Sequence, residues 1–296
     1  MTSKYLDTNS KIPFYFSVDF EDFYYDTNRR LGNPYPSFKL AAVKESYEII
    51  NRYSDQFFAG RRMTFFVTAV LARKAPDLIQ KIFNDGHEIA CHYNYHDSVD
   101  NETAETLCEN LDIAIDILHS ITGERPVGFR APNFAISADN TFAYEELAKR
   151  FKYDSSYKTS EHKSQIFKNG EFLFGDNSLK EFFVYGMPYA FGKINIRTGG
   201  TFLRLCPISL TIKAMKQAYN KQHAPLLYLH PFDILTEKEF WITWKDLKFM
   251  NIKPRAIFWL RQNQWSNLGN KTVETKIEQI CKIFEHQGPM REHLVE

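Results

Sequence analysis

The run at residues 85–97 reads DGHEIACHYNYHD and combines a turn, a short apolar segment and two histidines. Its Asp-Gly pair supplies the positive-φ position that a sharp reversal of the chain needs. Residues 87–91 are too few for a helix and are mostly apolar, which predicts a buried strand. His92 would end this strand and His96 would follow in a loop, so that two imidazoles could hold one metal ion.

The first predicted strand spans residues 12–18, and a cluster of acidic residues follows it. This cluster is a second indication of a metal site. Asp19, Glu21 and Asp22 are three carboxylates after a buried strand; they repel one another and are costly to desolvate, which indicates a cation. Because side chains two apart share one face of a strand, Asp19 and Glu21 would point into one site. If the strand instead ends at Phe20, Asp22 becomes the candidate ligand, and the sequence leaves both alternatives open.

Strand-like and helix-like segments alternate along nearly the whole chain. The apolar runs predict further strands at 63–67, 127–130, 182–185 and 225–229, and the periodicity predicts helices at 39–53, 102–123, 137–149, 207–219 and 272–285, with another that begins at Pro76. Residues 24–37 contain glycine and two prolines, which predicts an irregular loop. This alternation predicts an α/β fold with a parallel sheet, in a single domain that spans residues 1–296.

Unusual polar residues fall at the carboxyl ends of the predicted strands. In parallel barrels, catalytic residues occupy this position. The residues are Asp19, His92, Arg130, Asp154 and His230. One such coincidence means little, but five in succession predict that the site lies at this edge of the sheet.

The bulk composition excludes several classes of protein. The 37 basic and 36 acidic residues nearly cancel, which gives no argument for nucleic-acid binding. No uncharged apolar run reaches the length of about 18 residues that a membrane span needs, and residues 1–10 lack the pattern of a signal peptide. The four cysteines show no Cys-x-x-Cys spacing, which favours reduced thiols and a cytoplasmic location.

The motifs, taken in order, resemble those of the polysaccharide deacetylases, the NodB-homology family also called carbohydrate esterase family 4. The acidic run at residues 17–22 is similar to the first motif, and His92-x-x-x-His96 is similar to the second. The run at 130–134 (RAPNF), the run at 154–156 (DSS) and the run at 229–231 (LHP) resemble the remaining three. The Gly-rich run at 199–204 (GGTFLR) resembles a segment of members from cell-surface polysaccharide gene clusters.

This resemblance implies a distorted (β/α)7 barrel, with motifs between residues 14 and 235 and a C-terminal helical completion at 236–296. It also implies one divalent metal ion held by His92, His96 and one carboxylate, either Glu21 or Asp22. Zn²⁺ is the first candidate, and Co²⁺, Ni²⁺ or Fe²⁺ would suit the same ligands. Such a site keeps open positions for water and substrate, as hydrolysis requires.

The resemblance further implies roles for the remaining polar residues. Asp19 would be the general base, and Arg130 would pair with it and fix its orientation. His230 would be the general acid that protonates the departing amine. Asp154 would hold the tautomer of His230, or else cap a turn. The substrate would lie against Pro132, Asn133 and Phe134, with the Asn133 N–H stabilising the oxyanion.

From these residues and the resemblance we predict a metal-dependent hydrolase that removes an N-acetyl group from an amino sugar in surface polysaccharide or O-antigen biosynthesis. Two alternatives remain: a hydrolase of another C–N bond, such as a cyclic ureide, an imide or an N-formyl group, and a catalytically dead carbohydrate-binding protein. The sequence does not identify the sugar, its nucleotide, lipid or polymer carrier, or the oligomeric state.

Overall fold

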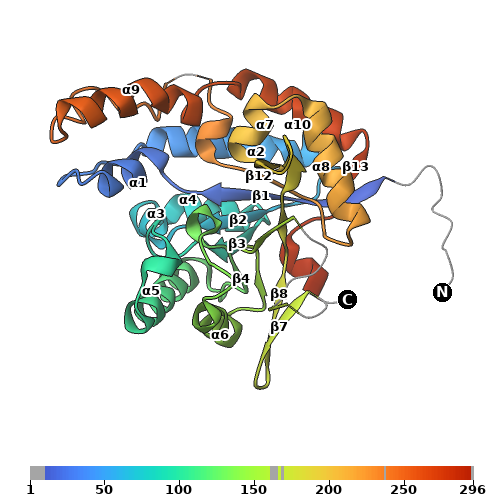
Figure 1. Cartoon of the computed structure of the whole chain (residues 1–296). Coiled ribbons are helices and arrows are strands. Elements are labelled where there is room, and N and C mark those ends of the chain that lie inside the picture. Colours follow the sequence, from blue (N-terminus) through green and yellow to red (C-terminus); the bar gives the residue numbers. More distant parts are fainter. Residues whose placement is uncertain (1–10, 161–165, 168–169, 237, 295–296) are drawn as a thin grey trace, which may run out of the picture.

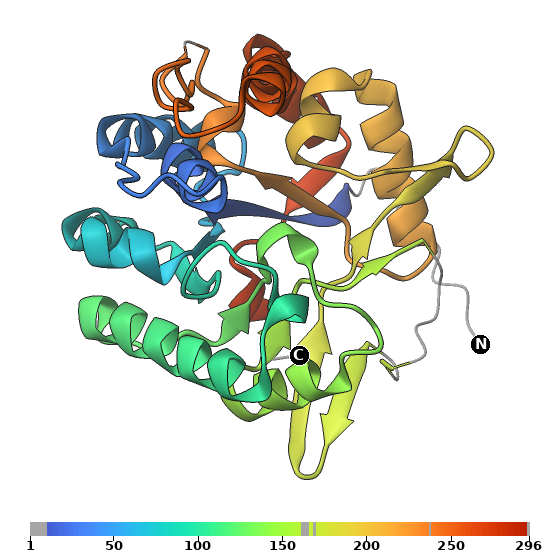
Figure 2. The same cartoon turned by 60° about the vertical axis from the view of Figure 1, so that its left-hand side comes forward.

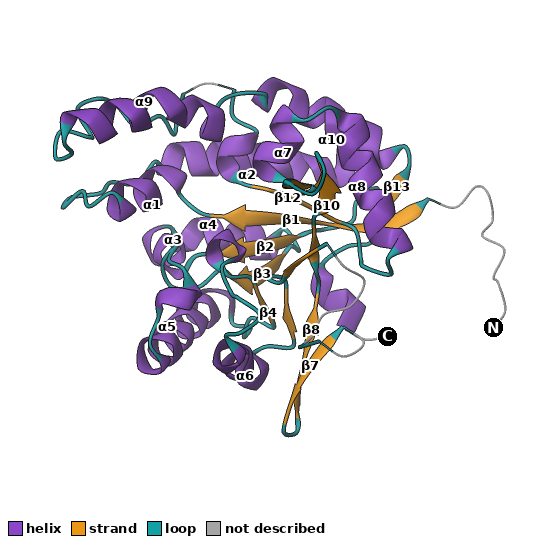
Figure 3. Cartoon of the chain, in the orientation of Figure 1, coloured by secondary structure: helices purple, strands orange, loops and turns teal. Residues whose placement is uncertain are grey.

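The computed structural model describes residues 11–160, 166–167, 170–236 and 238–294, without the side chains of 263–265. Residues 1–10, on which the expectation about a signal peptide depends, lie outside this part of the chain. Within it, strands occupy the middle of the molecule and helices lie around them (Figures 2 and 3). The structure therefore has the α/β organisation that the alternating sequence predicts.

The central sheet contains seven parallel strands in the order β12-β1-β2-β3-β4-β5-β8. They are β1 (Ile12–Phe20), β2 (Thr64–Val67), β3 (Glu88–Cys91), β4 (Gly128–Phe129), β5 (Tyr153–Asp154), β8 (Asn177–Glu181) and β12 (Leu226–Leu229). At its edges, β7 (Glu171–Phe174) is antiparallel to β8, and β13 (Phe284–His286) is parallel to the start of β1. Among the described residues no ladder of hydrogen bonds joins β8 to β12, so closure into a complete barrel stays a prediction.

The helices cover the outer face of this sheet (Figure 1). They are α1 (Phe23–Arg30), α2 (Leu40–Gln56), α3 (Ala69–Lys74), α4 (Pro76–Asn84), α5 (Ala104–Thr122), α6 (Thr141–Arg150), α7 (Gly200–Leu205), α8 (Ile208–Asn220), α9 (Ile252–Ser266) and α10 (Val273–Cys281). Four short strands lie beyond the main sheet: β6 (Lys158–Thr159) pairs with β9 (Val184–Tyr185), and β10 (Met187–Tyr189) pairs with β11 (Ile194–Ile196). None of the described helices is both long and apolar enough to cross a membrane.

Alternation along the strands separates two apolar layers. On β1, Phe14, Phe16 and Val18 belong to the large cluster that packs against the helices. Tyr15, between them, belongs to a second cluster with residues of β2, β3, β5 and β12 on the inner face. Because Asp19 has the same parity as Tyr15, the alternation turns its side chain to the inner face, away from the helices.

Two segments differ from the sequence prediction. Residues 24–37 were expected to form only a loop, but α1 begins at Phe23 because Asp22 caps it, its Oδ1 accepting the Tyr25 N–H at 3.0 Å. The helix expected at 272–285 ends at Cys281, and β13 follows it. The segment 236–296 is therefore not entirely helical, since it contributes a strand that lies beside β1.

Candidate active site and metal centre

The predicted site residues lie at one edge of the parallel sheet, which we call the carboxyl edge. Asp19 and Asp154 lie at the ends of β1 and β5. His92, Arg130 and His230 directly follow β3, β4 and β12. Because neighbouring parallel strands end at the same edge, residues far apart in the chain converge there.

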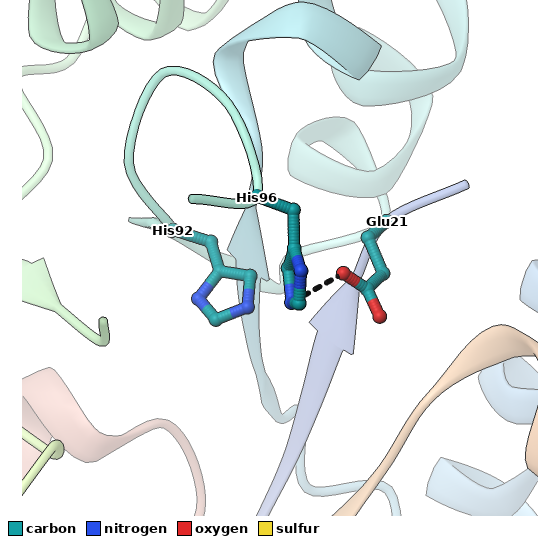
Figure 4. A group of neighbouring side chains, drawn as sticks. All are labelled: Glu21, His92 and His96. Carbon is teal, nitrogen blue, oxygen red and sulfur yellow. Dashed lines mark ion pairs between the residues drawn. The ribbon is translucent and has the colours of Figure 1, made fainter. Parts of the chain in front are cut away.

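Three of these side chains form a group with the geometry of a metal site. One ligand atom from each of Glu21, His92 and His96 lies within 4.8 Å of the other two, and all three residues are buried. Figure 4 shows the ring of His96 between His92 and the Glu21 carboxylate. The His96 Nε2 lies 2.7 Å from Glu21 Oε2. One carboxylate and two imidazoles are a donor set that suits Zn²⁺ and related divalent ions.

The loop after β3 brings the two histidines together. The Asp-Gly turn before the strand has φ of 90° at Gly86, as the sequence predicts. After the strand, Tyr93 takes the left-handed conformation with φ of 70°, which reverses the chain between His92 and His96. The carbonyls of Tyr93 and Asn94 accept the first N–H groups of α3, each at 3.0 Å, and so anchor the loop.

His92 is held in the tautomer that a metal ligand needs. Its Nδ1–H donates to the Arg130 carbonyl at 2.7 Å, which leaves the lone pair on Nε2. Burial lowers the pKa of His92 to about 4, so the ring is neutral at pH 7. Among the described residues, the buried Nε2 has no hydrogen-bond partner. A buried, unpartnered lone pair beside a carboxylate fits a bound cation.

The carboxylates near these histidines have different roles. Burial opposes ionisation of Glu21, but the charge and hydrogen bond of His96 outweigh it and lower the pKa of Glu21 to about 2. Asp22, the alternative ligand, points away: its oxygens accept the N–H groups of Tyr25 and Lys39. Asp22 is therefore occupied as a helix cap, and Glu21 is the carboxylate that lies with the histidines.

Asp19 lies beside this group in an ion pair. The Arg130 guanidinium donates to Asp19 Oδ1 at 2.6 Å and to Ser17 Oγ at 2.9 Å, and both charged side chains are buried. Burial alone would raise the pKa of Asp19, but the charge and the hydrogen bond of Arg130 outweigh it and keep the pKa below the ordinary value. Asp19 is therefore ionised, and Arg130 fixes the direction of its carboxylate.

His230 lies across from Asp19, with Nε2 at 3.7 Å from Asp19 Oδ2. Its Nδ1–H donates to Asp233 Oδ2 at 2.8 Å, and Asp233 also accepts from the Arg204 side chain. Burial lowers the pKa of His230, but the Asp233 hydrogen bond and the charges of Asp233, Asp19 and Glu21 raise it to about 9. His230 therefore carries a proton at neutral pH.

The structure corrects the partner predicted for His230. Asp154 was expected to orient this histidine, but its oxygens accept from the Ser156 hydroxyl at 2.6 Å and the Ser156 N–H at 3.0 Å. Burial raises the pKa of Asp154, and it interacts with the buried Glu181 across the β5–β8 pair. The turn-capping alternative for Asp154 is therefore the observed one, and Asp233 orients His230 instead.

The segment after Arg130 borders the site. Pro132 and Phe134 are buried and Asn133 is exposed, with φ of 56° and 53° at Asn133 and Phe134. The Phe134 ring packs edge-on against Tyr228, whose ring centroid lies 5.0 Å away. No contact in the structure tests the predicted substrate roles of these residues, which remain predictions.

Two family sequence models match the chain. Residues 59–152 match polysaccharide deacetylase, and residues 163–287 match a domain of unknown function, DUF3473. A peptidoglycan deacetylase-like protein of Gibberella zeae is 30% identical over 145 residues, which cover 43% of this chain and 42% of that protein. An uncharacterised protein of Geobacillus stearothermophilus is 29% identical over 83 residues, which cover 28% and 31%. The chain thus spans less than half the length of these curated relatives.

Solved structures share the fold at low sequence identity. A protein of Mycobacterium smegmatis described as a polysaccharide deacetylase is 22% identical, with a TM-score of 0.50 over 90% of this chain and 91% of that one. A Pseudomonas aeruginosa protein described in the same way is 15% identical, with a TM-score of 0.52 over 96% and 89%. These structures share the fold of this chain, and residues 59–152 match the sequence model of polysaccharide deacetylase.

Proposed function

We propose that the protein is a metal-dependent hydrolase that removes an N-acetyl group from an amino sugar during the biosynthesis of surface polysaccharide or O-antigen. The observation that carries the proposal is the convergence of a metal-type ligand group with an ionised carboxylate and a protonated imidazole. The ligand group is Glu21, His92 and His96. The other two residues are Asp19 and His230, which face each other at 3.7 Å.

Glu21, His92 and His96 would hold one divalent ion, with Zn²⁺ as the first candidate. When bound, the ion would supply Lewis acidity that polarises the amide carbonyl and favours ionisation of the attacking water. The Arg130 carbonyl supports the group by fixing the His92 ring. The side chain of Arg130 also donates to Asp19. Arg130 therefore positions both the ligand His92, through its carbonyl, and the proposed base Asp19, through its guanidinium.

Asp19 would act as the general base. It is ionised, buried and directed by Arg130, so one of its oxygens can take a proton from the attacking water. Its other oxygen stays bonded to the guanidinium. Because Arg130 is permanently charged, the pair favours the ionised form of Asp19, which a general base needs.

His230 would act as the general acid. It holds a proton at neutral pH and can transfer it from Nε2 to the departing amine, a step that amide hydrolysis requires. Asp233 holds the Nδ1–H and keeps Nε2 directed to the site. The Asn133 N–H would stabilise the charge that develops on the carbonyl oxygen.

The test is acetate release from N-acetylated amino-sugar oligosaccharides by the purified full chain. We expect release with one bound divalent ion per chain, loss of release with a chelator, and recovery when Zn²⁺ is added back. Stoichiometric metal without any acetate release from such substrates would contradict the proposed activity, and release that is insensitive to chelation would contradict the metal.

A further inference from the structure

A small polar pocket lies beyond the carboxyl edge of the sheet. It has a volume of about 110 Å³, and its lining includes Lys158, Thr159, Ser160, Asn195 and Arg197. The hydrogen bonds between β5 and β8 continue into the β6–β9 pair, so Lys158 lies beyond the carboxyl edge of the sheet. The pocket therefore lies beyond the same edge of the sheet as Asp19, His92 and His230.

Two chain segments connect the pocket to the catalytic centre. Arg197 precedes Gly199, which bridges to Tyr228, and Gly200, where an added Cβ would lie 3.2 Å from the His230 ring. On the other side, Lys158 follows Ser156, whose hydroxyl accepts the Ala131 N–H at 2.8 Å. Residues near the pocket in sequence thus contact the segments that carry His230 and Arg130.

Two basic side chains, Lys158 and Arg197, line this pocket. Both side chains belong to the lining of the same small pocket, and burial, with the Arg197 charge added, lowers the pKa of Lys158. Asp100 is the acid that acts on Lys158, but its Oδ1 already accepts from Ser137 and Asn140. Among the residues that the structure describes, neither cation forms an ion pair with a carboxylate. Two cations that line one pocket create a positive potential there, which favours the binding of an anion.

We propose that Lys158 and Arg197 form a subsite for an oxyanion of the substrate. The proposal rests on the deacetylase function above and narrows its substrate class to amino sugars that carry a negative charge. The anion is a phosphate ester to a carrier or the carboxylate of a neighbouring uronic acid. The guanidinium would bind two oxygens in parallel, the ammonium a third, and the hydroxyls of Thr159 and Ser160 would complete the donors.

Binding of inorganic phosphate to the metal-loaded full chain tests the subsite without requiring turnover. We compare the wild type, the Lys158→Gln/Arg197→Gln double variant, and Lys193→Gln, which removes an exposed charge outside the pocket in the β10–β11 turn. Calorimetry should show at least tenfold weaker binding for the double variant and unchanged binding for the control. Equal affinity for all three proteins would overturn the subsite. The thermal midpoints should agree, because neither cation has a structural ion pair to lose.

Kinetics with three N-acetylated substrates then identify the source of the anion: a neutral oligosaccharide, a phosphate-linked sugar and a uronic acid-containing oligosaccharide. We expect the double variant to lose at least tenfold in kcat/KM on one anionic substrate and to keep the rate on the neutral one. An equal loss on all three substrates would overturn the proposal. If no substrate is hydrolysed but phosphate binding still depends on both cations, the deacetylase function fails and the anion subsite stands.

Discussion

Both edges of the parallel sheet bury ionisable side chains, but the two edges differ in whether these side chains have hydrogen-bond partners. At the edge where the strands begin, which we call the amino edge, the Glu88 carboxylate accepts from Thr64 and Tyr153 at 2.7 and 2.9 Å and from the Arg291 N–H at 3.1 Å. At the carboxyl edge, within the described residues, His92 Nε2 and both oxygens of Asp26 are buried without a partner. Buried polar groups cost free energy unless they are satisfied, so the first edge serves the fold and the second is built for a ligand.

A substitution in the ligand group should give the largest loss of activity relative to its effect on stability. Glu21→Gln keeps the volume but removes the charged ligand, so metal binding should be lost and kcat/KM should fall by about four orders of magnitude. Stability in urea should change far less than activity. Metal analysis and acetate release measure the two effects, and a variant that retains one ion per chain would show that Glu21 is not a ligand.

Asp19→Asn should separate the base from the ligands at the same edge. We expect kcat/KM to fall about a thousandfold while the metal content stays at the wild-type level. The reason is that Asp19 is held by Arg130 and is not part of the ligand group. Loss of metal in this variant would instead make Asp19 a ligand.

The amino edge should respond to acid. Burial lowers the pKa values of His87 and His286 to about 4, below the ordinary 6.5. In both rings Nδ1 accepts a backbone N–H, and protonation would remove this acceptor. Their neutral forms stabilise the fold fully above pH 6.5, and this stability is lost as the pH falls towards 4, by about 3 kcal/mol per ring.

Urea unfolding at successive pH values measures this loss, and His286→Gln should reduce the slope between pH 6.5 and 4. Stability that does not change over this range would contradict the neutral buried state of both rings. His230 is not expected to contribute to this loss, because its pKa is raised to about 9 and it stays protonated throughout.

Glu88→Gln tests the satisfied network directly. The amide replaces one acceptor oxygen by a donor, which faces the donors of Thr64, Tyr153 or Arg291, so the free energy of unfolding should fall by about 2 kcal/mol. Acetate release per folded molecule should stay at the wild-type level, which is the reverse of Glu21→Gln. If Glu88→Gln lost activity while its stability stayed unchanged, the amino edge would not differ from the carboxyl edge in the way described.

The smallest effect is expected at Asp26. Its carboxylate is buried near His96, whose Nδ1 also has no partner among the described residues, and burial raises the pKa of Asp26 to about 7. A carboxylate close to a ligand histidine tunes its orientation and basicity. Asp26→Asn should therefore weaken metal affinity by about tenfold in competition with a chelator. Unchanged affinity would limit Asp26 to a structural role.

Local chemistry decided which features the sequence could predict. The Asp-Gly turn, the buried strand after it and the positions of polar residues at strand ends depend on neighbouring residues, and the α/β fold with parallel strands follows from them. The partner of His230 was missed, although Asp233 follows it by three residues, because its role depends on a tight turn and on Arg204 from a distant helix. Helix α1 was missed because two prolines after its end, Pro34 and Pro36, suggested a loop throughout.

The position of β13 determines how much of the chain must be synthesised before the sheet can fold completely. It lies beside the start of β1, and the segment after it supplies the Met290 N–H to Thr64 and the Arg291 N–H to Glu88. A nascent chain that still lacks these residues exposes the flank of β1, and the side chains of Thr64 and Glu88 lack donors that are made more than 200 residues later. The flank of β1 is therefore protected against pairing with another molecule only after the chain has been made as far as residue 291.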